Sequence, residues 1–339
     1  MQRSPWIIWP VLFLALFVTF LLHLVSGPVD VPFGEAIAAL FDTSGEGLGT
    51  QVIRKVRVPE GLTAVVVGAA LGACGVMMQT LFGNPLAGPG VLGVTSGAGL
   101  GVALVMLASA GASLPGLSVD ALVVAGASCG SFGVLLLILW ADRRLQDGVS
   151  LLIVGLMVGY FCSALISILE VAAGAEALKG YVLWGMGTFA AVGPDRSPLV
   201  FGLLATGCVL AMGTAKPLDA MQLGETYAAT MGLQVSRTRT LVVVLTGCLA
   251  GVATAFCGPI AFLGLATPHV ARGLFGRSDH RFLIPATMLL GSILALLCAT
   301  VVRSTGPVSA LPLNAVTALL GVPVVVWVLI RGRRWMRMG

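Results

Sequence analysis

The residue types that do most protein chemistry are few in this sequence and stand too far apart to form an obvious site. Its 3 histidines, His23, His269 and His280, are widely separated, and none of its 7 cysteines belongs to a C-x-x-C pair. Catalytic and metal sites usually draw on close groups of such residues. We therefore expect that the chain is not itself an enzyme, that it binds no metal or other cofactor, and that its cysteines are small buried apolar residues.

Nucleotide hydrolysis is the next chemistry to consider. The phosphate-binding loop G-x-x-x-x-G-K-[ST] requires Ser or Thr after its lysine. The lysines of this chain, Lys55, Lys179 and Lys216, are followed by Val, Gly and Pro. If ATP and Mg²⁺ drive this protein, they must bind to a separate chain.

The composition indicates the elements that position the remaining polar residues. The chain has 339 residues, of which 58% are hydrophobic and 10% charged, and its mean hydropathy is +1.02. Soluble proteins carry about 25% charged residues, so we predict one all-α, polytopic membrane domain over residues 1–339. The net charge of +5 is scattered between apolar blocks and forms no basic face, which argues against a nucleic-acid partner.

Apolar blocks long enough to cross about 30 Å of hydrocarbon recur along the chain. We predict about ten transmembrane helices, with both termini cytoplasmic because this topology leaves most lysines and arginines inside. Residues 172–193 are apolar but too short to cross, so an interfacial or re-entrant helix is expected there. The predicted spans are 6–25, 62–82, 91–110, 119–140, 149–171, 198–215, 240–257, a proline-interrupted short span at 258–272, 282–302 and 313–330.

A polar segment at residues 216–232 separates two of these blocks and should lie at the cytoplasmic boundary. Gly224 and Gly232 bracket a run of helix-forming residues that starts with Glu225. We predict a short helix that ends at its glycine. An ordinary solvated loop is the alternative.

Four motifs in the same order resemble one family. From Arg57 the chain reads R-V-P-E-x16-M-M-Q-x4-N-P-L-A-x-P-x2-L-G-V-x2-G-A, and matching stretches follow at 224–232, 258–272 and 311–323. Together they resemble the permease subunits of ATP-binding cassette (ABC) importers for iron chelates, haem and cobalamin. The chain departs from the family pattern at Glu60, usually arginine, at Ala299, usually aspartate, and at Asn314, usually glycine.

The resemblance implies a set of partners. Two copies of the permease would form a homodimer in the inner membrane, in contact with membrane lipid, with two ABC ATPase subunits that bind ATP and Mg²⁺. A periplasmic or lipid-anchored substrate-binding protein would deliver the cargo. Arg57 and Arg303 match the arginines that meet glutamates of that protein. The segment that inserts into the ATPase would include Gly224, Glu225, Ala228, Met231 and Gly232, with Gly224 and Glu225 leading.

The resemblance also assigns roles inside the membrane. The span at 149–171 would line the translocation pathway with Gly155, Gly159, Ser163 and Ser167, although close helix packing explains these small residues equally well. His269 is expected to be structural and not an iron ligand. It belongs to a set of motif residues with structural roles: Gln79, Asn84, Pro85, Gly264, Pro268, His269 and Arg272.

Two rival classes remain. An ion-coupled secondary transporter of a bulky solute would need an ionisable residue deep in the membrane, whereas Glu170 and the other acidic residues fall at predicted span ends. A membrane-embedded enzyme would need a cluster of catalytic side chains. The motifs leave the substrate open between ferric siderophore, haem and cobalamin, and they do not identify the gates.

Overall fold

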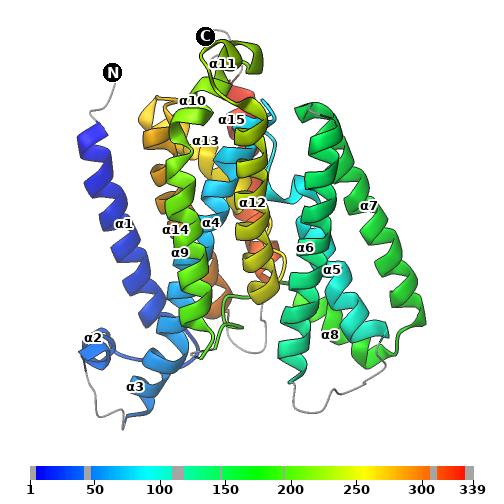
Figure 1. Ribbon diagram of the computed structural model, residues 1–339. Coiled ribbons are helices and arrows are strands. Elements are labelled where there is room, and N and C mark those ends of the chain that lie inside the picture. Colours follow the sequence, from blue (N-terminus) through cyan, green and yellow to red (C-terminus); the bar gives the residue numbers. More distant parts are fainter. Residues whose placement is uncertain are drawn as a thin grey trace.

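A computed structural model describes residues 5–41, 47–108, 118–145, 147–193, 195–305 and 311–332 of the chain. The described residues are helical, without strands, and the long helices run between two ends of one bundle (Figure 1). The short helices α10 (Ala215–Gln222) and α11 (Glu225–Thr230) lie at one end, where α1 (Pro5–Val25) begins. The short helices α2 (Phe33–Phe41), α3 (Leu48–Val52) and α8 (Ala175–Gly185) lie at the other. We refer to these as the α11 end and the α8 end.

Six of the described helices are long and apolar enough to cross a membrane. They are α1, the continuous helix Leu48–Leu81, α6 (Val119–Leu145), α7 (Gly148–Ala172), α12 (Val235–Cys257) and α14 (His280–Ser304). A seventh arises if α9 (Ser197–Gly213) and α10, which meet at 50°, count as one span. The prediction of a polytopic, all-α membrane protein is confirmed.

Several helices differ from the predicted spans. The second span begins earlier than expected, because α3, the π-helical turn η1 (Ile53–Arg57) and α4 (Val58–Leu81) form 34 uninterrupted residues. Its neighbour, Val94–Ala108, is shorter than 18 residues, whereas α15 (Leu313–Gly332) agrees with the predicted span at 313–330. Val94–Ala108 comprises α5 (Val94–Ala103) and η3 (Leu104–Ala108), and the predicted end of this span at residue 110 lies outside the described residues.

Two short elements follow the sequence prediction. Helix α8 has 11 residues, so it reaches about 17 Å and cannot cross the membrane. In the 258–272 block, helix α13 (Leu263–Phe275) starts only after a non-helical stretch, and Phe262 before it adopts a left-handed φ of 65°. Gly258 and Pro259 therefore shorten this block, as its sequence indicates. The predicted interruption at Pro268 is wrong, because Pro268 lies inside the continuous helix α13.

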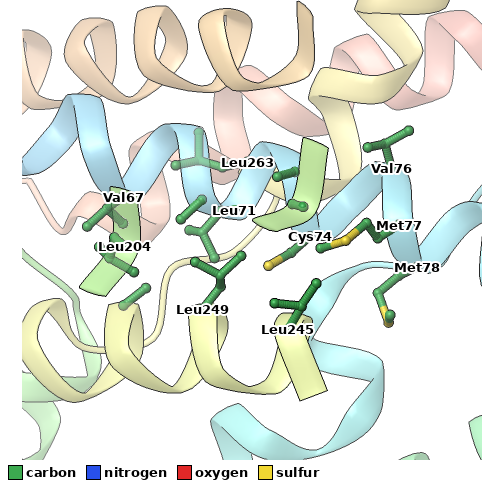
Figure 2. Close-up of a cluster of buried hydrophobic side chains, with 14 of the residues drawn as sticks. Val67, Leu71, Cys74, Val76, Met77, Met78, Leu204, Leu245, Leu249 and Leu263 are labelled. Atoms are coloured by element: carbon green, nitrogen blue, oxygen red, sulfur yellow. The ribbon is translucent and has the colours of Figure 1, made fainter. Parts of the chain in front are cut away.

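Helix α4 forms the centre of the core, where it packs on α9, α12, α13 and α14. Leu71 and Cys74 of α4 face Leu245 and Leu249 of α12 in the apolar cluster of Figure 2. A Cβ added at Gly75 would collide with the carbonyl oxygen of Gly264 in α13. Gly264 is therefore a packing residue, which lets two helix backbones touch, as small residues do in membrane bundles.

The cysteines only partly follow the prediction. Cys74, Cys162, Cys257 and Cys298 are buried and Cys208 is half-buried, but Cys129 and Cys248 are exposed. The expectation was wrong for these two because the outer surface of a membrane bundle is also apolar, so an apolar residue can lie on either side of a helix.

Candidate functional site

The polar segment at 216–232 forms two short helices at the α11 end. Gly224 lies between α10 and α11 with a φ of +105°, and Gly232 follows α11 with a φ of +84°. Both values lie in the region that glycine adopts without strain. The predicted short helix between two glycines is confirmed.

This segment exposes three large apolar side chains, although it is otherwise polar. Leu223 is 64% exposed, Tyr227 54% and Met231 62%, whereas Ala228 is fully buried against the bundle. We call Leu223, Tyr227 and Met231 the apolar ridge. Sequence reasoning named Met231 but missed Leu223 and Tyr227, which the four-residue spacing of apolar types within a polar segment could have revealed.

Glu225 contacts the membrane helices. Its Oε1 accepts a hydrogen bond of 2.6 Å from Nη2 of Arg239, a residue of α12 that is only 3% exposed. Nη1 of Arg239 lies 3.6 Å from Oδ1 of Asp142 on α6, and the Thr240 hydroxyl donates to Asp142 Oδ2 at 3.0 Å. One guanidinium thus connects α11 to α12 and α6. We call this network the Arg239 anchor.

A second polar network ties α10 to the centre of the bundle. Oδ1 of Asp219 accepts from the backbone N–H of His280 at 2.8 Å and lies 2.6 Å from His280 Nδ1. The other ring nitrogen, Nε2, lies 2.6 Å from the Thr80 hydroxyl on α4. His280 is 1% exposed, so this His280 anchor joins α10, α14 and α4 through a buried side chain.

The predicted structural motif residues of the first and third motifs meet next to these anchors. Arg272 Nη1 donates to Gln79 Oε1 at 2.6 Å, and Gln79 Nε2 donates to the carbonyl of Leu265 at 3.3 Å. His269 Nε2 lies 2.8 Å from the carbonyl oxygen of Pro85. These contacts hold α13 against α4 and the loop that follows it.

The two remaining motif residues act locally. Asn84 shapes the loop after α4, because its Oδ1 accepts from the backbone N–H of Leu86 at 2.9 Å. Pro268 lies inside α13, where it is buried.

At the α8 end, Arg57 faces inward. It is 1% exposed, and its guanidinium donates to the carbonyls of Leu24 at 2.6 Å, Val25 at 2.9 Å and Val29. The first two carbonyls belong to the last turn of α1, which has no intrahelical partners for them. Arg57, which the resemblance assigned to contact with the substrate-binding protein, thus completes the hydrogen bonding of a helix end within its own chain, and that assignment stays a prediction.

Arg303 is also paired inside the chain. Its Nη2 forms an ion pair with Oε2 of Glu60, and the side chains are 9% and 11% exposed. Glu60, one of the departures from the family pattern, supplies the charge that balances Arg303. Arg54 and Lys55, one turn before Arg57, are exposed.

The departure at Asn314 has a structural explanation as well. Its amide nitrogen donates to the carbonyls of Gly185 at 3.0 Å and Pro259 at 2.7 Å, and its Oδ1 accepts from the N–H of Ala261 at 3.0 Å. Asn314 thus joins α15 to the end of α8 and to the loop before α13. Ala299 is buried within α14.

The small residues of α7 divide between packing and a cavity. A Cβ added at Gly155 would collide with the carbonyl of Val91, so this glycine serves close packing. Gly159 lies beside Ser96, and Ser167 is exposed. Ser163 lines a cavity of about 250 Å³ between α5, α7 and α8. Close helix packing therefore explains Gly155, whereas the pathway role of this set stays a prediction.

Comparisons with known proteins agree with this architecture. The family model described as "FecCD transport family" matches residues 15–331. The vitamin B12 import system permease protein BtuC of Klebsiella pneumoniae is 37% identical over 320 residues, covering 94% of this chain and 92% of the relative. The Salmonella typhi protein of the same name is 38% identical over 286 residues, covering 84% and 86%.

One solved structure covers nearly the whole chain. It shows an inward-facing conformation of a transporter assigned to the metal-chelate type of ABC transporters. The TM-score is 0.83 and the sequence identity 30%, over 97% of this chain and 100% of that one.

Proposed function

Because the chain belongs to the FecCD transport family and is therefore the permease subunit of an ABC importer, we propose that it carries cobalamin or an iron chelate, such as a ferric siderophore or haem, into the cytoplasm. It works as a homodimer in the inner membrane with two ABC ATPase subunits and a substrate-binding protein. The observation that carries this proposal is an apolar ridge on a segment whose charged residues are hydrogen-bonded into the membrane helices.

The orientation follows from the charges at the two ends. Arg143 and Arg144 end α6, and Arg237 lies near the start of α12, all exposed and all at the α11 end. Basic residues favour the cytoplasmic side. We therefore place the α11 end in the cytoplasm, with about ten passes once α5, α13 and α15 are counted as short crossings.

The apolar ridge is the surface proposed to bind the ATPase. Three exposed apolar side chains in a polar, water-facing segment are unfavourable unless a partner covers them. Gly224 and Gly232 shape the segment, Ala228 seats it on the bundle, and Glu225 transmits its movement instead of leading the docking. ATP-driven closure of the partner would then displace a segment that is attached to four membrane helices.

The α8 end is proposed to receive the substrate-binding protein. Arg57 and Arg303 are hydrogen-bonded or paired within the chain, so they stabilise the structure that carries this surface instead of contacting the partner directly. The exposed Arg54 and Lys55 supply the charge that steers the partner. Because Glu60 balances the charge of Arg303, the part of the substrate-binding protein that faces Arg303 needs no carboxylate there.

The proposal is tested by changing the ridge without disturbing the fold. Tyr227→Arg should abolish co-purification of the ATPase and ATP-dependent uptake in proteoliposomes, because a charge would have to enter an apolar interface. Gln234→Arg, an equally exposed position outside the ridge, is the matched control and should behave as wild type. Retention of the ATPase by Tyr227→Arg, or uptake driven by an ion gradient without any ATPase, would overturn the assignment.

A further inference from the structure

The cavity beside Ser163 has a lining that differs from the rest of the bundle. Thr95, Ser96 and Gly99 of α5 form one wall, Ser163 of α7 a second, and α8 closes it with aromatic side chains. Figure 1 shows α8 lying across the ends of α5 and α7, far from α11. The cavity is therefore at the end where the proposed cargo would enter.

Within the described residues, the hydroxyls of Thr95, Ser96 and Ser163 make no hydrogen bond, whereas several other hydroxyls of the bundle bond to a backbone carbonyl. Elsewhere Thr63 donates to the carbonyl of Pro59 at 2.7 Å, and Thr267 to that of Leu263 at 2.9 Å. Such local bonds are how a helix satisfies a hydroxyl in an apolar environment. The hydroxyls of Thr95, Ser96 and Ser163 remain available for a molecule in the cavity.

The aromatic wall adds flat apolar surface. Tyr181 and Trp184 are stacked with ring centroids 6.1 Å apart and an angle of 25° between the rings. The Tyr181 hydroxyl lies beside Gly99, 3.5 Å from where a Cβ of that residue would be. Aromatic faces with hydroxyl groups beside them suit a planar molecule that carries polar groups on its edge.

The charge around the cavity limits what that edge can be. No lining residue is an Asp, Glu, Lys or Arg. Burial and the negative charge of Glu170 raise the pKa of Tyr181 to about 12, so the phenol remains a neutral hydrogen-bond donor. A carboxylate entering here would find no cation among the lining residues and would be repelled by Glu170.

We propose that this cavity is a transient contact site for the uncharged edge, bearing carboxamide or hydroxyl groups, of a planar chelate cargo. The proposal rests on the proposed import function and narrows its substrate class. The aromatic pair contacts the flat face, and Thr95, Ser163 and Tyr181 exchange hydrogen bonds with the edge. A site built from a few neutral hydrogen bonds is weak, as a transport pathway requires.

The test uses the full importer complex in proteoliposomes and two probes. Cyanocobalamin has carboxamides on its ring edge, and haemin has carboxylates. Uptake per ATP hydrolysed is measured for each probe. The value for a variant is divided by the wild-type value for the same probe, so any preference of the substrate-binding protein for one probe cancels. Tyr181→Phe and Trp184→Leu should each lower cyanocobalamin uptake per ATP hydrolysed about two- to tenfold, the effect of one lost hydrogen bond or stacking contact.

Two further variants make the result specific. Tyr160→Phe makes the same chemical change on the outer face of α7, where Tyr160 is 64% exposed, and should have no effect. Ser163→Lys places a cation on an exposed position of the cavity and should shift the preference towards haemin. ATP-driven uptake that ignores all the cavity substitutions would refute the site and leave the import function intact. Wild-type vesicles that take up neither probe but import a ferric siderophore with ATP would refute the site alone, and vesicles that import none of the three would refute both.

Discussion

Substitutions in the Arg239 anchor should affect two quantities differently: the free energy of unfolding, and the amount of cargo transported for each ATP hydrolysed. Arg239 and Asp142 are 3% and 4% exposed. Arg239→Met would leave Asp142 with only the Thr240 hydroxyl, and breaking a buried ion pair in this way costs about 3–5 kcal/mol. The Glu225 side chain is 43% exposed, so Glu225→Ala should lower the free energy of unfolding by only about 0.2–1 kcal/mol.

The loss of cargo transported per ATP should not follow the loss of stability among these variants. Glu225→Ala removes the hydrogen bond that joins α11 to Arg239, so the ATPase should still dock and hydrolyse ATP while less cargo moves for each ATP. The double variant Asp142→Leu with Arg239→Met removes both buried charges, so most of the lost stability should return. It should not restore coupling, because α11 would still lack its contact with α12.

The assays are thermal unfolding of the purified permease and uptake per ATP hydrolysed in proteoliposomes. Arg237→Met is the control, because Arg237 is exposed and lies two residues before Arg239. The reasoning fails if Glu225→Ala transports as much cargo per ATP as wild type. It also fails if the charge-free double variant transports normally, since the anchor would then be structural only.

Four other outcomes follow from the same contacts. Arg57→Ala should lower the free energy of unfolding by about 3 kcal/mol through lost charged hydrogen bonds, and hydrogen exchange should rise at the end of α1. Glu60→Arg should destabilise by a similar amount because a buried cation loses its partner, and adding Arg303→Glu should restore the pair and most of the stability. Asn314→Gly should cost about 1–3 kcal/mol and speed exchange of the Ala261 amide. Spin labels on α7 and α14 should change separation when ATP binds, whereas labels on α4 and α14 should not.

Local sequence signals predicted the shapes of several elements. Glycines at 224 and 232 predicted the short α11, and Gly258 and Pro259 predicted the non-helical start of the 258–272 block, because these residues act on the backbone within one turn. The apolar blocks predicted the long helices by length alone. The extension of α4 back to Leu48 was missed, since glycine and charge in residues 47–60 suggested a polar loop.

The partners of charged and polar residues were beyond such signals. Glu60 and Arg303 lie far apart in the sequence, as do Asn314 and Gly185, and nothing local to either member indicates the other. Arg57 was assigned to the partner surface by the resemblance, and its burial against α1 could not be read from the sequence. The need for a donor at this position is evident only from the fold, which places Arg57 next to the carbonyls of Leu24 and Val25 at the end of α1.

The two anchors attach the α10–α11 segment to parts of the bundle that differ in rigidity. The His280 anchor leads to α14 and α4, whose backbones touch at Gly68 and Gly291. The Arg239 anchor leads to α12 and α6, and α6 packs on α5 and α7. Only 17% of the most apolar stretch of α7 is buried within the chain, compared with 78% of that stretch in the helix that contains α4. Because close-packed helices resist relative movement, a push on the segment should leave α4 and α14 together and displace α6 and α7. Ser163 on α7 lines the cavity, so the same displacement of α7 would change the cavity walls. A push on the segment at the α11 end would then release cargo held at the α8 end.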